Sequence, residues 1–254
     1  MTKRCYNIAD LRAVAKRRLP HGLFEFVDRG VEDETAMSEN IAAFRAVKLI
    51  PRPMIDVGAR TTRSTLLGRP VAMPLAIAPT GAAGLCWYEG ELALARAAAE
   101  FGVPFTLATA SMTAMDLIAA ALPEGRFWFQ LYMYEDKALS FELVERARRA
   151  GAEALLLTVD QTAPPNREYM DRNGFNLPFR ITPRTVADVI RHPAWGLGVL
   201  ARYLLTTGMP RNRNYPANFQ SSILADPKKR IGMANDRIEW KDVETLRSVW
   251  PGKL

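Results

Sequence analysis

The clearest fold signal in the chain is a pair of apolar runs, FWFQLY (residues 127–132) and ALLLTVD (residues 154–160). Two similar runs precede them, MPLAIAPT (residues 73–80) and PFTLAT (residues 104–109). Near-continuous hydrophobicity is typical of strands that are buried on both faces of a parallel sheet. The sequence therefore predicts an α/β fold with four strands at regular distances along the chain.

Helical patterns separate the four runs, and Gly102 and Gly151 end the first and the last of these patterns, as glycine commonly does. The predicted helices lie at residues 90–102, 112–122 and 137–151. A further helix is expected at residues 241–250, and the chain ends at PGKL, where a fifth strand would begin. The first sixty residues form a separate helical extension, with Asn7 or Asp10 as its first N-cap and Gly30 ending its second helix.

A long segment interrupts this pattern between the fourth strand and the last helix. Residues 161–238 are rich in Pro, Asn and Arg, and we predict an irregular loop insert there. This insert carries twelve Lys and Arg against five Asp and Glu, which accounts for the whole net charge of +7. A basic segment on an otherwise neutral chain indicates a local anionic partner and argues against general nucleic-acid binding.

The remaining composition is that of a globular cytoplasmic protein. Apolar residues make up 48% of the chain and charged residues 24%. Neither a signal peptide nor an uncharged apolar run long enough to span a membrane is visible in the sequence. Cys5 and Cys86 match no metal or redox spacing, which suits a reducing compartment, and we expect both to be structural.

Polar side chains are predicted to gather where two neighbouring strands end. Because side chains alternate along a strand, Gln130 and Tyr132 share one face of their strand, and Thr158 and Asp160 share one face of the next. These groups could simply cap the strands and bond one another. Two adjacent strands with the same arrangement favour a ligand site, because α/β barrels bind ligands at this rim.

Two further features lie near the same rim. The turn APTGAAG (residues 78–84) consists of small residues, which either form a tight strand-to-helix connection or let a planar ligand approach the backbone. Arg167, just beyond the fourth strand, could bind a carboxylate through two parallel hydrogen bonds. Neither His21 nor His192 follows a predicted strand, so we expect both to be structural, and no metal constellation is present.

The insert also contains an apolar stretch, WGLGVLARYLLTTGMP (residues 195–210), which arginines flank on both sides. It is too short to span a bilayer, and its composition is typical of a segment that lies in an anionic membrane interface. We therefore expect residues 191–213 to contact a membrane, on the inner face of the cytoplasmic membrane. A flap over the barrel mouth or an oligomer contact is the alternative.

Taken in order, these motifs resemble the FMN-dependent 2-hydroxy-acid dehydrogenases and oxidases. The resemblance rests on APTG, WFQLY, LTVD with Arg167 seven residues later, FEFVDRGVEDE near the N-terminus and the closing WKDVETLRSVWPGKL. The basic insert is similar to that of the membrane-associated members, the L-lactate and mandelate dehydrogenases. The resemblance implies a TIM-type (β/α)₈ barrel, of which residues 61–254 would hold about the first four βα units, after a helical extension at residues 1–60.

The resemblance also implies roles for individual residues. Tyr132 would contact the substrate hydroxyl, and Arg167 would hold the substrate carboxylate. A glycine at position 81 is the residue found in those dehydrogenases of the family that pass electrons to a quinone-type acceptor. The implied FMN contacts are Pro79, Thr80, Gly81, Gln130 and Thr158.

Three departures from the family pattern are visible. Phe26 stands where the family has a Tyr for the substrate carboxylate, and Ala108 replaces a Ser that contacts the flavin. The Lys beside the flavin, the catalytic His that takes the substrate proton, and the phosphate-binding loops are not among the 254 residues. We therefore expect this chain to be inactive alone, and to act as a homo-oligomer or with a complementing C-terminal half. The alternative is a non-catalytic remnant that serves as a peripheral membrane or assembly component.

Overall fold

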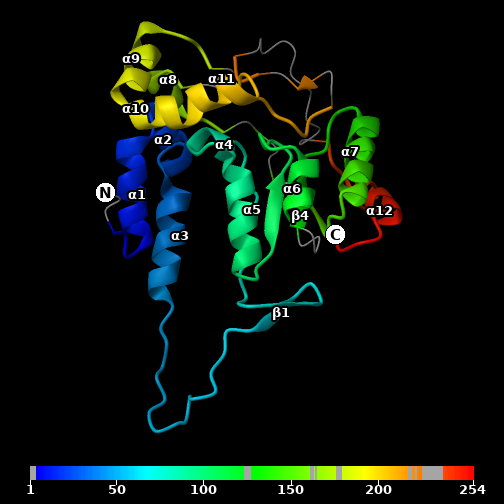
Figure 1. Ribbon diagram of the computed structural model, residues 1–254. Coiled ribbons are helices and arrows are strands. Elements are labelled where there is room, and N and C mark those ends of the chain that lie inside the picture. Colours follow the sequence, from blue (N-terminus) through cyan, green and yellow to red (C-terminus); the bar gives the residue numbers. More distant parts are fainter. Residues whose placement is uncertain are drawn as a thin grey trace.

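The computed structural model describes residues 4–122, 127–160, 163, 165–175, 179–216, 219–220, 222–224 and 237–254. Its centre is a parallel sheet with the strand order β3 (Phe105–Ala108), β4 (Phe127–Leu131) and β5 (Ala154–Leu157). Helices α5 (Gly90–Glu100), α6 (Met115–Ala121) and α7 (Lys137–Arg149) precede or follow these strands along the chain, as the apolar pattern predicted (Figure 1). The described residues form an open sheet, so the barrel expected from the resemblance is present only in part.

Side-chain alternation divides this sheet into two faces. Phe127, Phe129 and Leu131 belong to the main hydrophobic core together with side chains of α6 and α7, such as Ile118 and Leu143. Gln130 points the other way, and the register places it beside Ala108 on β3 and Leu156 on β5. The predicted assignment of faces is therefore confirmed for β4.

The first predicted strand is much shorter than expected. Instead of a strand over residues 73–80, only Ile77 pairs with the sheet, in parallel with Phe105. Its N–H donates to the Pro104 carbonyl at 2.9 Å, and its own carbonyl accepts from Thr106 at 3.0 Å. Pro74 and Pro79 lack an N–H, which limits regular pairing on either side of Ile77.

The opposite edge of the sheet carries the start of another strand. Lys253 forms a parallel bridge with Ala154, and its carbonyl accepts from the Leu155 N–H at 2.8 Å. Lys253 thus lies within PGKL, where the sequence pattern placed the beginning of a fifth strand. Helix α12 (Trp240–Val249) leads into this strand and buries Leu246 and Trp250 in the main core.

The N-terminal region is helical, with a hairpin that the sequence pattern did not predict. Asn7 is the N-cap of α1 (Ile8–Arg18) and accepts a hydrogen bond from the Asp10 N–H. Helix α2 (His21–Asp28) ends before Gly30 rather than at it, and α3 (Thr35–Ala46) follows. An extended arm then leads to β1 (Ser64–Leu66) and β2 (Arg69–Val71), whose turn residues Leu67 and Gly68 both have positive φ (Figure 1).

The insert is not an irregular loop in its described parts. It contains α8 (Glu168–Asn173), α9 (Pro183–Arg191) and a nearly continuous helix made of α10 (Pro193–Trp195), the π-helical η1 (Gly196–Ala201) and α11 (Arg202–Thr206). Apolar positions on these helices pack on α2 and α4 (Ala83–Cys86), and they form a second core around Leu23, Leu85 and Trp195. This long-range packing, absent from local sequence patterns, makes the segment helical.

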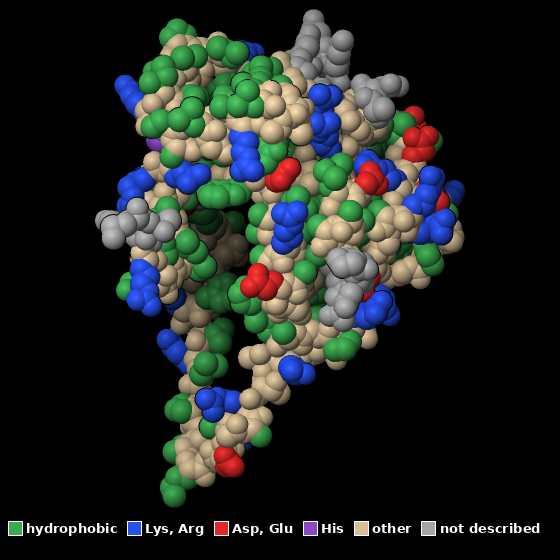
Figure 2. All heavy atoms as spheres, viewed as in Figure 1, with side chains coloured by type: hydrophobic (Ala, Val, Ile, Leu, Met, Phe, Trp, Pro, Cys, Tyr) green, Lys and Arg blue, Asp and Glu red, His purple; other side chains and the backbone are tan. Residues whose placement is uncertain are grey.

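The insert forms a layer over the carboxyl ends of the strands (Figure 1). The space-filling view shows hydrophobic side chains gathered over this layer, with Lys and Arg near its edge (Figure 2). Exposed apolar residues there include Ile181, Ile190, Leu197, Leu204 and Leu205. None of the described helices is both long and apolar enough to cross a membrane.

A buried carboxylate joins α5 to α4 and to the loop after β3, and the insert layer packs beside it. Glu91 on α5 is only 1% exposed, and it accepts hydrogen bonds from the N–H groups of Gly84 and Met112 and from the Thr113 hydroxyl. The Tyr203 hydroxyl of α11 lies beside this cluster and accepts from the Glu89 N–H at 3.1 Å. Burial raises the pKa of Tyr203 to about 12, so the phenol stays neutral and the contact is a hydrogen bond between uncharged groups.

Candidate active site

The predicted polar cluster is present at the carboxyl ends of β4 and β5. Gln130 is 4% exposed, and its Nε2 donates to the Thr158 hydroxyl at 2.8 Å. Thr158 comes directly after β5, where its N–H donates to the Leu131 carbonyl at 3.1 Å. The parallel register between β4 and β5 therefore brings two residues that are 28 positions apart into direct contact.

Thr109 completes this cluster, and the sequence reasoning did not single it out. Its N–H donates to Gln130 Oε1 at 3.1 Å, so the amide of Gln130 is held at both ends. Its hydroxyl donates to the Gln130 carbonyl at 2.6 Å and accepts from the Tyr132 N–H at 3.2 Å. Thr109 is a positioning residue. The sequence feature that could have pointed to it is its polar side chain at the end of the strand next to β4.

The turn with Pro79, Thr80 and Gly81 lies beside this cluster in the fold. It connects the Ile77 bridge to α4, and the Ala82 N–H fixes its end by donating to the Ala110 carbonyl at 3.2 Å. Thr80 and Gly81 are exposed, so their backbone groups are open to a ligand. Ala108, the last residue of β3, is buried opposite Gln130 and offers only a methyl group.

Arg167 and Phe26 form a second cluster. The Arg167 guanidinium lies 5.4 Å from the centroid of the Phe26 ring, which joins the N-cap of α8 to α2. The Arg167 Nε is buried and has no hydrogen-bond partner among the described residues. Burial raises the pKa of the nearby Tyr169, although the charges of Arg167 and Arg29 oppose this shift. A buried guanidinium nitrogen without a partner is a binding group for an anion such as a carboxylate.

Each of the two histidines is engaged within its own helix or helix end. His21 Nε2 lies 3.4 Å from the Glu25 carboxylate, one turn along α2. His192 Nδ1 lies 2.8 Å from the Asp188 carbonyl oxygen and 3.2 Å from its carboxylate. Both contacts are local, which agrees with the structural role expected for these residues.

A parallel α/β sheet with polar groups at the carboxyl ends of its strands is an arrangement in which α/β proteins commonly bind ligands. Residues 15–254 match the family described as FMN-dependent dehydrogenase, and the chain belongs to that family.

Relatives and solved structures agree with this assignment. The chain is 37% identical over 249 residues to a provisionally named L-lactate dehydrogenase of Mycobacterium tuberculosis, covering 98% of this chain and 58% of that protein. It is 32% identical over 254 residues to (S)-mandelate dehydrogenase of Pseudomonas putida, covering 100% and 63%. The crystal structure of a monotopic membrane (S)-mandelate dehydrogenase superposes with a TM-score of 0.89 at 32% identity, covering 99% of this chain and 66% of that one. The chain thus spans roughly three fifths of the length of these curated relatives.

FMN is the cofactor of this family, and the donor set of the strand-end cluster fits it. After its bond to Thr158, the Gln130 amide still has a second N–H hydrogen. The Thr158 hydroxyl accepts from Gln130 and keeps its own hydrogen to donate. A flavin ring presents carbonyl oxygens to such donors, so two adjacent donors on one face of the sheet suit its polar edge.

Proposed function

We propose that this chain forms the flavin-contacting half of an enzyme that oxidises a small 2-hydroxy acid, lactate-like or mandelate-like, to the 2-oxo acid. The observation that carries the proposal is the 2.8 Å hydrogen bond between Gln130 and Thr158 at the carboxyl ends of two neighbouring strands. We further infer that the open sheet is part of a (β/α)₈ barrel. The bridge at Lys253 supports this, because it starts a further parallel strand next to β5.

In this proposal the chain's own residues bind the two reactants. Gln130 and Thr158 donate to the flavin ring, while the backbone of Pro79, Thr80 and Gly81 lies against it. Arg167 holds the substrate carboxylate through its buried Nε, for which the described part of the chain offers no hydrogen-bond partner. FMN supplies the acceptor for the hydride equivalent when it is bound.

Tyr132 stabilises the charge that develops on the substrate hydroxyl oxygen in this scheme. Its backbone N–H is fixed by Thr109, which sets the direction in which the chain leaves β4. The aromatic ring is half-buried and shares the strand face of Gln130. Its position therefore supports contact with both the flavin edge and the substrate.

Proton removal needs a residue outside the 254 positions. The two histidines are engaged in local contacts, and neither belongs to the strand-end cluster. General acid–base catalysis contributes about 10²–10⁴-fold to a rate. We therefore expect the purified chain to show no 2-hydroxy-acid oxidation with an artificial electron acceptor, and measurable turnover would contradict this part of the proposal.

Flavin retention tests the central proposal directly. The chain is expressed in the presence of FMN and passed through gel filtration, and flavin absorbance is measured across the protein peak. Co-elution of flavin with the folded chain is the expected result. A folded, monodisperse chain that loses all flavin under these conditions would overturn the half-site proposal and favour the non-catalytic remnant.

We also propose that the insert contacts the cytoplasmic face of a membrane and that the electron acceptor is a quinone-type molecule. The apolar side chains over α9 to α11 support membrane contact, because residues such as Leu205, 87% exposed, have no described neighbour to bury them. Glycine at position 81 is the residue that the resemblance associates with dehydrogenases, and it supports the proposal of a quinone-type electron acceptor. Co-sedimentation with anionic vesicles tests the contact, and replacing Leu204 and Leu205 with Ser should reduce the bound fraction.

A partner is also proposed for the lower end of the molecule. An extended arm lies between α3 and β1 (Figure 1). Its exposed apolar side chains include Leu49, Ile50 and Met54. Either a complementing C-terminal half or a second copy of the chain could bury them. Sedimentation velocity on the purified chain separates these two cases, since only the second gives a dimer or larger assembly from this chain alone.

A further inference from the structure

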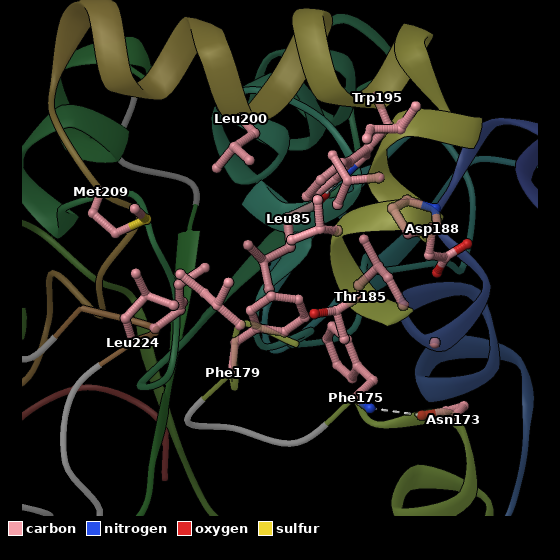
Figure 3. Close-up of a pocket in the computed structure, with 18 residues that line it drawn as sticks. Leu85, Asn173, Phe175, Phe179, Thr185, Asp188, Trp195, Leu200, Met209 and Leu224 are labelled. Atoms are coloured by element: carbon pink, nitrogen blue, oxygen red, sulfur yellow. Dashed lines mark hydrogen bonds between the residues drawn. The ribbon is translucent and has the colours of Figure 1, made fainter. Parts of the chain in front are cut away.

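A partly open apolar cavity lies between the insert and the N-terminal helices, apart from the strand-end cluster. Its volume is about 230 Å³. Leu23 and Leu85 contribute from α2 and α4, while Trp195 and Leu200 point into it from α10 and η1 (Figure 3). Phe175 and Phe179 form the opposite wall in the same view.

The cavity runs from a buried base to an exposed mouth. Leu23, Leu85 and Trp195 are all buried at its base. Two other lining residues, Ile181 and Ile190, are 70% and 71% exposed. They belong to the apolar face of the insert layer that we propose to lie against the membrane, so the cavity opens on the side where lipid would be.

The polar groups of the lining leave little for a polar ligand to bind. Among the described lining residues, Asn173 donates to Glu25, Thr185 donates to the carbonyls of Arg180 and Thr182 just before α9, and Trp195 Nε1 donates to the Leu85 carbonyl at 2.6 Å. Asp188 is paired with His192. Because these groups already have partners, the interior suits a hydrocarbon chain better than a polar ring.

The volume of the cavity and the charge near its mouth further limit which ligand it can bind. Ligand pockets for whole drug-sized molecules measure about 300–1,000 Å³, so this smaller cavity suits one segment of a larger molecule. Arg180 and Arg191, both exposed, flank the mouth residues Ile181 and Ile190 in the sequence. Exposed guanidinium groups beside an apolar opening are complementary to a phosphate headgroup.

We propose that this cavity binds one acyl chain of an anionic phospholipid, whose headgroup pairs with the arginines at the mouth. The inference rests on the proposed membrane contact of the insert, and it adds a specific lipid site to a general interfacial surface. The wall formed by Phe175 also contacts the proposed substrate side of the molecule, because the rings of Phe175 and Phe26 lie 5.5 Å apart and the Arg167 guanidinium lies over the Phe26 ring. Lipid occupancy would thus hold Phe175 in place behind Phe26.

The test uses the full chain and a short-chain phosphatidylglycerol below its micelle concentration, with binding measured by calorimetry. One lipid per chain should bind, and short-chain phosphatidylcholine should bind more weakly. Val186→Phe, at the half-exposed mouth, should weaken phosphatidylglycerol binding by about tenfold or more, because it displaces methylene groups from the cavity. Leu205→Phe is the matched control, since it adds the same ring to the apolar face outside the cavity and should leave this affinity unchanged.

Other arms separate the alternatives. Replacing Arg180 and Arg191 with Gln should remove the preference for phosphatidylglycerol over phosphatidylcholine while the cavity remains intact. Vesicle co-sedimentation is measured in parallel on every variant. Vesicle binding with no short-chain lipid binding, or with equal affinity in Val186→Phe and Leu205→Phe, overturns the cavity proposal and leaves the membrane contact standing. If the unmodified chain does not bind vesicles, both the cavity proposal and the membrane contact are overturned. If a short-tailed quinone binds and phosphatidylglycerol does not displace it, the choice of a phospholipid as the occupant is overturned.

Discussion

The guanidinium of Arg167 lies 5.4 Å from the ring centroid of Phe26, on two elements that are far apart in the sequence. The contact orients a cation that the sequence placed only in a loop after the fourth strand. An aromatic face holds the guanidinium by a cation–π interaction but donates no hydrogen bond to a ligand. In the proposed function, this pair positions Arg167 for the substrate carboxylate and leaves residue 26 without a hydrogen-bond donor.

Phe26→Tyr supplies this donor. The added hydroxyl should tighten binding of a 2-oxo acid such as pyruvate by about 3- to 10-fold, the usual range for one added hydrogen bond. Titration of the FMN-loaded chain, followed by flavin absorbance, measures the affinity. Phe26→Leu is the control, because it removes the ring beneath Arg167 and should weaken binding. Equal affinities for Phe and Tyr at this position would show that residue 26 does not face the substrate.

Thr158→Val should weaken FMN binding by about 5- to 30-fold, because it removes the hydroxyl and leaves a Gln130 N–H without its partner. Thr158→Ser keeps the hydroxyl and should bind FMN nearly as well as the unmodified chain. Fluorescence titration with FMN measures both constants. If Val and Ser at position 158 weaken binding equally, the hydroxyl has no part in holding the flavin.

Glu91→Leu should lower the free energy of unfolding by at least ~3 kcal/mol, because the N–H groups of Gly84 and Met112 lose their acceptor in a buried site. Glu91→Gln should cost far less, since its oxygen can accept from both N–H groups and its amide can donate to the Thr113 hydroxyl, which is free to rotate. Urea unfolding followed by circular dichroism gives the values. Glu100→Gln, at the exposed end of the same helix, is the control and should change the free energy of unfolding by no more than ~0.5 kcal/mol. If Gln and Leu at position 91 lower this free energy equally, the negative charge of Glu91 is itself essential.

Asp242 should make stability depend on pH in the acid range. Burial raises the pKa of this carboxyl, but hydrogen bonds from Lys137 and from the Glu239 N–H outweigh burial, so the net shift is downward from 3.8. A lowered pKa in the folded state means that the contribution is complete above the unfolded pKa and is lost as pH falls through the folded value. Asp242→Asn should therefore cost about 1 kcal/mol at neutral pH, where the half-exposed Lys137 weakens the pair.

Thermal unfolding of the Asp242→Asn variant and the unmodified chain, compared between neutral pH and pH 3, measures this effect. The difference in stability should shrink toward zero as pH falls below 3.8. A difference that stays constant across this range would show that the charge of Asp242 does not contribute to stability, because the hydrogen bonds from Lys137 and from the Glu239 N–H both favour the ionised carboxylate.

Local sequence patterns were sufficient for the parallel sheet and for the strand-end cluster. Buried parallel strands require continuous apolar runs, and side-chain alternation along a run fixes which residues share a face. Gln130 was therefore placed on its correct face, and Gly102 and Gly151 follow their helices with the positive φ expected of glycine there. Asn7 likewise capped α1, because capping involves only neighbouring residues.

Tertiary structure alone decided the form of the insert, the extent of the first strand and the roles of Thr109 and Glu91. The insert helices are stabilised by packing on α2 and α4. Thr109 contacts Gln130 only because β3 and β4 pair side by side, and local sequence does not reveal this contact. The same holds for Phe26 and Arg167, which are 141 positions apart and meet through α2 and α8. Local spacing encodes periodicity and caps, whereas contacts between distant segments depend on how the whole chain packs, and this chain's polar clusters depend on such contacts.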